Sequence, residues 1–102
     1  MDIRNEFGET PLMTAIRSGP STSLAKMIDV LLDGGADPNI QDVNGNSALH
    51  HAAKVVGKEG AVPILLENGA SVVLRNNNGE TAVDLATDDA IIELLREAAV
   101  GE

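Results

Sequence analysis

"DVNGNSALHHAA" (42–53) decides the fold, because its pattern occurs three times along the chain. "NEFGETPLMTAI" (5–16) and "NNNGETAVDLAT" (76–87) share one template with it. Each copy has a polar residue, two variable positions, a glycine, another variable position, a serine or threonine, and then a run of small and apolar residues. The template glycines are 37 and 34 residues apart. A period of this length indicates a repeat architecture rather than an isolated site.

The template predicts a turn followed by a helix. Its glycine suits a turn with positive φ and occurs at Gly8, Gly45 and Gly79. Its hydroxyl residue is placed as a helix N-cap and occurs at Thr10, Ser47 and Thr81. A second template, "VLLDGGADPN" (30–39) and "ILLENGASVV" (64–73), predicts a second helix. Gly35 and Gly69 fit the C′ position just beyond the end of that helix.

These residues give the chain a resemblance to the ankyrin-repeat family, through "GETPLMTAI", "GGADPNIQDVNGNSALHHAA" and "ENGASVVLRNNNGETAVDLA". The resemblance covers about residues 2–99. It implies an all-α solenoid of three stacked helix–turn–helix repeats with projecting hairpin loops. We expect a single domain over residues 1–102, with repeats at about 5–41, 42–75 and 76–99. The last repeat is shortened and resembles a C-terminal cap.

Several stretches depart from the repeat pattern. Extra residues lie near "GPSTS" (19–23), where Ser23 is a candidate cap for the following helix, and one more lies around Val55 and Val56. Pro63 clashes with a helix interior, so the second helix of repeat two should begin at or after Gly60. Asp88 or Asp89 is expected to cap the last helix.

Composition narrows the class of protein. The chain has 102 residues, enough for one modest domain, with 43% apolar residues but one Phe and no Trp or Tyr, so the core must be aliphatic. The absence of Cys excludes disulfides and zinc–thiolate sites. No secretory signal or transmembrane run is visible, which makes a cytoplasmic protein the expectation, or a nuclear one if the source is eukaryotic. The net charge of −9 argues against a nucleic-acid partner.

Catalytic, metal and cofactor sites are not expected. His50 and His51 are neighbours on a helix, about 100° apart, and cannot easily chelate one metal ion. "DVNGN" and "NNNGE" lack the carboxylates that a calcium loop needs at its first and last positions. The family resemblance implies that His50 joins its helix to the neighbouring loop backbone. For Asn39 the resemblance implies one of two roles, either a site of asparaginyl hydroxylation or a side chain that forms hydrogen bonds with loop backbone.

The resemblance implies a non-catalytic protein–protein interaction module that binds through its loop tips and concave face. The corresponding positions here are Arg4, Glu6, Phe7, Glu9, Arg17, Val43, Asn44, Asn46, Lys54, Arg75, Asn77, Asn78 and Glu80. Phe7 is either an exposed anchor or folded back onto its own helix. The set holds four bases, Arg4, Arg17, Lys54 and Arg75. Either these are positions that are often charged in the family, or they form a positive strip that selects an acidic partner segment. Arg17 and Lys54 are both expected to face solvent.

The alternative function is a structural or assembly role. Repeat one has no visible N-terminal cap, so apolar residues among Leu12, Ile16, Met27 and Ile28 should lie at the end of the stack. That end would pack on another copy, giving weak self-association, or on further repeats of a longer chain. No membrane partner is expected under either hypothesis.

Overall fold

The structure is a computed structural model that describes residues 4–18, 23–54 and 60–100. Within these ranges it has six helices and no strand, which confirms the all-α prediction. The helices are α1 (Pro11–Ser18), α2 (Leu24–Asp33), α3 (Ala48–Lys54), α4 (Ala61–Glu67), α5 (Ala82–Leu85) and α6 (Asp89–Val100). No helix in this part of the chain combines the length and the apolar character that crossing a bilayer requires.

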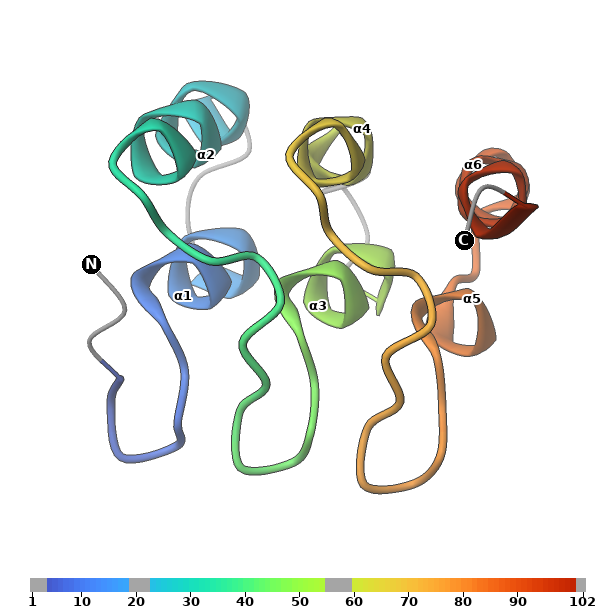
Figure 1. Cartoon of the computed structure of the whole chain (residues 1–102), viewed down its shortest axis with the longest axis horizontal. Helices are drawn as coiled ribbons and strands as arrows, with labels where there is room; N and C mark the ends of the chain where they lie inside the picture. Colours follow the sequence, from blue (N-terminus) through green and yellow to red (C-terminus); the bar gives the residue numbers. More distant parts are fainter. Residues whose placement is uncertain (1–3, 19–22, 55–59, 101–102) are drawn as a thin grey trace.

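The helices form two layers, with α1, α3 and α5 in one and α2, α4 and α6 in the other (Figure 1). Each helix packs on its counterpart in the next repeat, so α1 contacts α3, α3 contacts α5, and α2 contacts α4. Three loops precede α1, α3 and α5 and project in parallel from the same side of the stack (Figure 1). The architecture is a solenoid of three helix pairs, as the sequence predicts.

Most of the predicted helix boundaries are confirmed by hydrogen bonds. The Thr10 hydroxyl accepts the amide of Met13 at 3.3 Å at the start of α1. At the end of α2, Gly35 has a φ of 95°, and the amides of Gly35 and Ala36 donate to the carbonyls of Leu32 and Leu31. The same pair of bonds ends α4 at Gly69. Both helices therefore close with the αL glycine motif that satisfies their last carbonyls.

Two of the irregular stretches fall within the described residues. Helix α4 begins at Ala61, so Pro63 lies in its first turn, where its missing amide costs no helical hydrogen bond. Asp88 caps α6, because its Oδ1 accepts the amides of Ala90 and Ile91 at 2.8 and 3.3 Å. The prediction for Ser23 was wrong. Ser23 precedes α2 but makes no cap hydrogen bond, and its hydroxyl instead lies 3.9 Å from the Met27 sulfur. The inserted residues at 19–22 and around Val55 and Val56 lie outside the described residues.

Each loop is built around an Asn or Asp side chain that closes a local turn. Its Oδ1 accepts the amides two and four residues later, at 2.9 to 3.0 Å, and its own amide donates to the carbonyl four residues later. The three residues are Asn5, Asp42 and Asn76. They are the polar residues that open the sequence template, so the template encodes the loop as well as the helix start.

Neighbouring loops are joined by hydrogen bonds between their backbones. The amide of Val43 donates to the carbonyl of Phe7 at 3.0 Å, and the amide of Asn77 donates to the carbonyl of Asn44 at 2.9 Å. The third loop passes so close to the second that a Cβ on Gly45 would lie 2.7 Å from the Asn77 amide nitrogen. Glycine is therefore favoured at position 45 for two reasons. A side chain would clash with the third loop, and the φ of 78° is one that glycine adopts readily.

The core is aliphatic and runs between the two helix layers, with Leu12, Ile16, Ile28, Leu49 and Leu65 almost completely buried. His50 is one of the polar residues buried beside this core. Its Nε2 lies 2.9 Å from the Glu80 carbonyl, which can only accept, so Nε2 carries the proton. Its Nδ1 accepts from the amide and hydroxyl of Ser47 at 3.1 and 2.8 Å. His50 thus ties α3 to the third loop, as the resemblance implies.

Asn39 has the same kind of bridging role on the other side of the stack. Its side-chain amide donates to the Gly69 carbonyl at 3.0 Å, and its Oδ1 accepts the amide of Ser71 at 2.7 Å. Both partners are backbone groups of the following repeat, 30 and 32 residues away. The structure therefore gives Asn39 a place in the scaffold that accounts for its presence.

Candidate functional site

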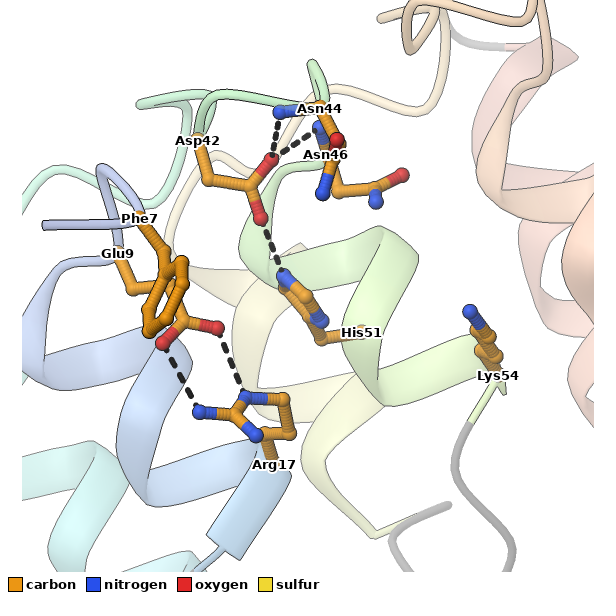
Figure 2. A pocket seen from close by; sticks show the side chains of 8 residues that line it. All are labelled: Phe7, Glu9, Arg17, Asp42, Asn44, Asn46, His51 and Lys54. Carbon is orange, nitrogen blue, oxygen red and sulfur yellow. Dashed lines mark hydrogen bonds and ion pairs between the residues drawn. The ribbon is translucent and has the colours of Figure 1, made fainter.

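A hollow of about 400 Å³ lies between the first two loops and the exposed side of α1 and α3 (Figure 2). Eight residues from both loops and both helices line it: Phe7, Glu9, Arg17, Asp42, Asn44, Asn46, His51 and Lys54. Seven of them carry polar or charged side chains. Six of the eight are positions that the sequence predicts for the loop tips and concave face, namely all except Asp42 and His51. The hollow is therefore the candidate site.

One wall of the hollow is a fixed ion pair between the first loop and α1. The Arg17 Nε donates to one Glu9 carboxylate oxygen at 2.8 Å, and Nη2 donates to the other at 2.9 Å. The amide of the Asn5 side chain donates to the same carboxylate at 3.0 Å. Glu9 is buried at 7% exposure. The hydrogen bond from Asn5 and then the bond from Arg17 lower the pKa of the Glu9 carboxyl below its ordinary value.

The opposite wall is a second pair, between Asp42 in the second loop and His51 on α3. The His51 Nε2 donates to the Asp42 Oδ2 at 2.9 Å. The His51 side chain is 11% exposed and the Asp42 side chain 4% exposed. Because Asp42 Oδ1 is already occupied by two loop amides, both carboxylate oxygens have partners. Figure 2 shows the two pairs facing each other across the hollow.

Glu9, Asp42 and His51 come close enough together to be examined as a metal site. One donor atom from each lies within 4.8 Å of the others. Each carboxylate already accepts hydrogen bonds, however, and the Arg17 guanidinium sits against Glu9 with its own positive charge. A cation would have to displace these donors and would be repelled by Arg17. The geometry therefore fits a hydrogen-bonded network, with Glu9 and Arg17 as an ion pair, better than a metal centre.

The rim of the hollow is apolar at the loop tips. Phe7 is 57% exposed and Val43 on the neighbouring loop is 58% exposed. Of the two placements open for Phe7 in the sequence, the structure shows the exposed one. Large apolar side chains exposed beside each other on a rigid loop pair are suited to contact another protein.

A second, smaller hollow of about 260 Å³ continues the site toward the third repeat. It is lined mainly by amide side chains from the second and third loops, including Asn44, Asn46, Asn77 and Asn78, together with Glu80. Lys54 lines both hollows. The exposed face thus changes from apolar at the first two loop tips to amide-rich at the third.

The four bases expected to form a positive strip have different environments. Arg17 is paired with Glu9, and Arg75 donates from Nη1 to the Gly79 carbonyl of its own loop at 2.8 Å. Arg4 lines a hollow on the outer side of α1, at the N-terminal end of the stack. Lys54 is exposed and has no ion pair with a described residue. Arg75 keeps its positive charge, because its partner is a neutral carbonyl, so the positive groups left for a strip are Lys54, Arg75 and the outer edge of the Arg17 guanidinium.

Asp42 and His51 were missed as site residues from the sequence. The available signal is that the three loop-opening residues are Asn5, Asp42 and Asn76. Only the aspartate offers a second carboxylate oxygen, and His51 lies nine residues after it in the same repeat. The pairing still depends on how the loop folds back over α3, which spacing alone does not determine.

Comparisons with known proteins agree with this architecture. The family described as ankyrin repeats (3 copies) matches residues 1–76 and 21–101. The neurogenic locus notch homolog protein 1 of Danio rerio is 42% identical over 85 residues, covering 83% of this chain and 3% of that protein. The Homo sapiens protein of the same name is 41% identical over 86 residues, with 84% and 3% covered. The chain therefore spans a small part of the relatives it matches.

Among solved structures, the chain is similar to the ankyrin repeat domain of Bcl-3, described as a unique member of the IkappaB protein family. The TM-score is 0.82 at 31% sequence identity. The match covers 93% of this chain and 40% of the Bcl-3 chain. The helix pairs and loops described above thus have close counterparts in an experimentally determined repeat stack.

Proposed function

The chain belongs to the ankyrin-repeat family, and from this premise we propose that it binds a partner protein through its loop tips and concave face. Repeats of this family generally serve as protein–protein interaction modules, and the fold is typically non-catalytic. The observation that carries the proposal is the hollow between the first two loops, with Phe7 and Val43 exposed at its rim. These two side chains are the proposed apolar anchors.

The rest of the proposed contact surface surrounds these anchors, except for Arg4, which lies on the outer side of α1. Its exposed members are Arg4, Glu6, Arg17, Asn44, Lys54, Arg75, Asn77 and Asn78, with Asn46 and Glu80 half-buried between them. Glu9 belongs to the surface through Arg17, whose orientation it fixes. A guanidinium already held by two hydrogen bonds loses little conformational entropy when a partner binds it.

We propose that the partner presents an acidic segment to the hollow. Lys54 supplies a positive charge that has no ion pair with a described residue, and the Arg17 Nη1 makes no hydrogen bond to a described residue. The rest of the molecule is acidic, at a net charge of −9. A small positive region on a negative body speeds and orients association with an acidic segment more than it raises the final affinity.

The experiment uses peptides selected on the intact protein from a random display library. Binding of one selected peptide is then measured by surface plasmon resonance for the wild type, Lys54→Glu and Phe7→Ser. Lys54→Glu should slow association by about tenfold at low salt, and the effect should shrink as salt is added. Phe7→Ser should mainly speed dissociation, because it removes an apolar contact.

Arg96→Glu is the matched control, since it makes the same charge change on α6, away from the hollow. It should leave the association rate nearly unchanged. The proposal fails if Arg96→Glu slows binding as much as Lys54→Glu, or if neither Lys54→Glu nor Phe7→Ser affects the selected peptides. Arg17→Glu is unsuitable for this test, because it would place a second carboxylate against buried Glu9 and disturb the fold.

A further inference from the structure

At the N-terminal end of the stack, repeat one presents an apolar face that no other described residue covers. A hollow of about 620 Å³ opens between α1 and α2, lined chiefly by Pro11, Thr14, Ala15, Ser18, Met27 and Leu31. A second hollow, of about 380 Å³, continues along α2. No helix lies on the outer side of α1 and α2 in Figure 1. Of the four residues among which the sequence places apolar surface at this end, Met27 lies on the face, whereas Leu12, Ile16 and Ile28 are buried in the core.

The same face is covered in the second repeat. Leu31 of α2 and Leu65 of α4 occupy equivalent places, because the carbonyl of each accepts the bond that closes its helix. Met27 and Ala61 lie one turn earlier. Ala61 and Leu65 are fully buried against the first repeat, whereas Met27 and Leu31 are half-buried. Within the described residues, the N-terminal face thus lacks the packing neighbour that the equivalent face of α4 has.

The charges along α2 identify the partner that fits. Lys26 and Asp33 are both exposed, and neither has an ion pair with a described residue. They lie seven residues apart, which is two helical turns, so they are on the same side of α2. Between them lies Val30, 62% exposed, beside Met27. A helix with opposite charges at its two ends and an apolar centre is complementary to an antiparallel copy of itself.

We propose that two copies of this chain associate through this face about a twofold axis, with α2 antiparallel to α2 of the second copy. Lys26 of each copy then meets Asp33 of the other, and Val30 lies near the axis. The small side chains of Thr14 and Ser18 allow the two α1 helices to approach each other. A twofold contact uses the same surface on both copies and closes at the dimer. This inference does not rest on the proposed function, since no partner peptide is involved.

The test is sedimentation velocity of the intact chain up to high micromolar concentration, with charge-reversal variants. Wild type should show a reversible monomer–dimer equilibrium. Lys26→Asp puts like charges at both contacts, and so does Asp33→Lys, so each variant alone should dimerise about tenfold more weakly. A one-to-one mixture of the two variants restores opposite charges at both contacts and should form the dimer again. Circular dichroism of each variant verifies that the fold is intact.

Arg96→Asp is the control for the charge change, and it should dimerise as the wild type does. The inference is overturned if the wild type stays monomeric, which would leave the face to a preceding repeat of a longer chain. It is also overturned if the mixture associates no better than its components, or if Arg96→Asp weakens the dimer as much as Lys26→Asp. Val30→Ser, which keeps the charges and removes the apolar centre, should weaken the dimer as well.

Discussion

At the scale of single residues, the stack depends on a few positions that no other residue type can fill equally well. Gly45 and Gly79 occupy equivalent places in successive loops, with φ of 78° and 77°. Their surroundings differ. A Cβ on Gly45 would meet the Asn77 amide and the Asn76 Cα at 2.7 and 2.9 Å, whereas a Cβ on Gly79 would meet nothing within 4 Å. Comparing the two positions therefore distinguishes the cost of a Cβ on a left-handed backbone from the cost of a steric clash with the neighbouring loop.

Replacing each glycine by alanine should give two different losses of stability. Gly79→Ala should lower the unfolding free energy by about 1–2 kcal/mol, the cost of a left-handed backbone with a Cβ. Gly45→Ala should lower it by about 1–3 kcal/mol more, because the third loop must also move away. Urea denaturation of the two variants measures the difference. Equal losses would mean that the close approach of the loops carries no energetic weight.

The buried Glu9 carboxylate predicts how stability changes with pH. Its pKa is lowered in the folded state, by Asn5 first and then by Arg17, below the ordinary value of 4.5. The folded protein therefore holds that proton less tightly than the unfolded chain, so this contribution is complete above pH 4.5 and is lost as the pH falls toward the lowered pKa. The gap in unfolding free energy between wild type and Glu9→Gln should narrow over that acidic range. Melting curves that stay parallel from neutral to acidic pH would contradict the assignment.

At the scale of elements, each helix is short and depends on its ends. Helix α6 is the longest, and Asp88 caps it with bonds to two amides. The local signals for these ends were readable in the sequence, since Pro63, Gly35 and Gly69 act on their own backbone. Ser23 shows the limit of that reasoning. Its hydroxyl lies at the N-cap position of α2 but contacts the Met27 sulfur instead of a helix amide.

The cap of α6 can be tested by comparing adjacent aspartates. Asp88→Ala should lower the unfolding free energy by about 1 kcal/mol, since two amides lose their acceptor. Asp88→Asn retains the oxygen and should lose much less. Asp89→Ala should cost less than Asp88→Ala, because it removes only a charge near the helix N-terminus. The assignment would be wrong if chemical denaturation ranked Asp89→Ala as the more harmful change.

The site was harder to read from the sequence than the helices. The concave positions follow from the repeat register, and the structure brings Phe7, Arg17, Asn44 and Lys54 around one hollow. The sequence could not predict which of the bases is paired with an acid, because the Arg17–Glu9 ion pair depends on how the first loop folds back over α1. Local patterns specify turns and caps, whereas ion pairs between a loop and a helix depend on packing distances that a one-dimensional pattern does not contain.

At the scale of the whole molecule, the helices in the described part of the chain make their main contacts within a repeat and between neighbouring repeats. Among the described helices, α3 and α4 are packed on both sides, whereas α1 and α2 contact a neighbouring repeat on one side and α5 and α6 on the other. In such a stack, stability is approximately a sum over repeats and their interfaces. The outer repeats can open while the middle one stays folded.

Native-state hydrogen exchange should show this order directly. Amides in the middle of α3 and α4 should exchange more slowly than those in α6 and α2, by about tenfold or more, because opening them breaks two interfaces instead of one. The measurement is made at low protein concentration so that association does not protect α2. Uniform exchange rates across all helices would instead mean that the three repeats unfold as one unit.

The hydrogen bonds between loops also affect which insertions and deletions the chain can tolerate. The amide of Val43 meets the carbonyl of Phe7 just as the amide of Asn77 meets that of Asn44, so the two interfaces are interchangeable in this respect. Duplication of the middle repeat would give each new loop a donor and an acceptor in the places they already occupy. Chain length is then open to variation by whole repeats, while a deletion of one or two residues inside a loop would break its bonds on both sides.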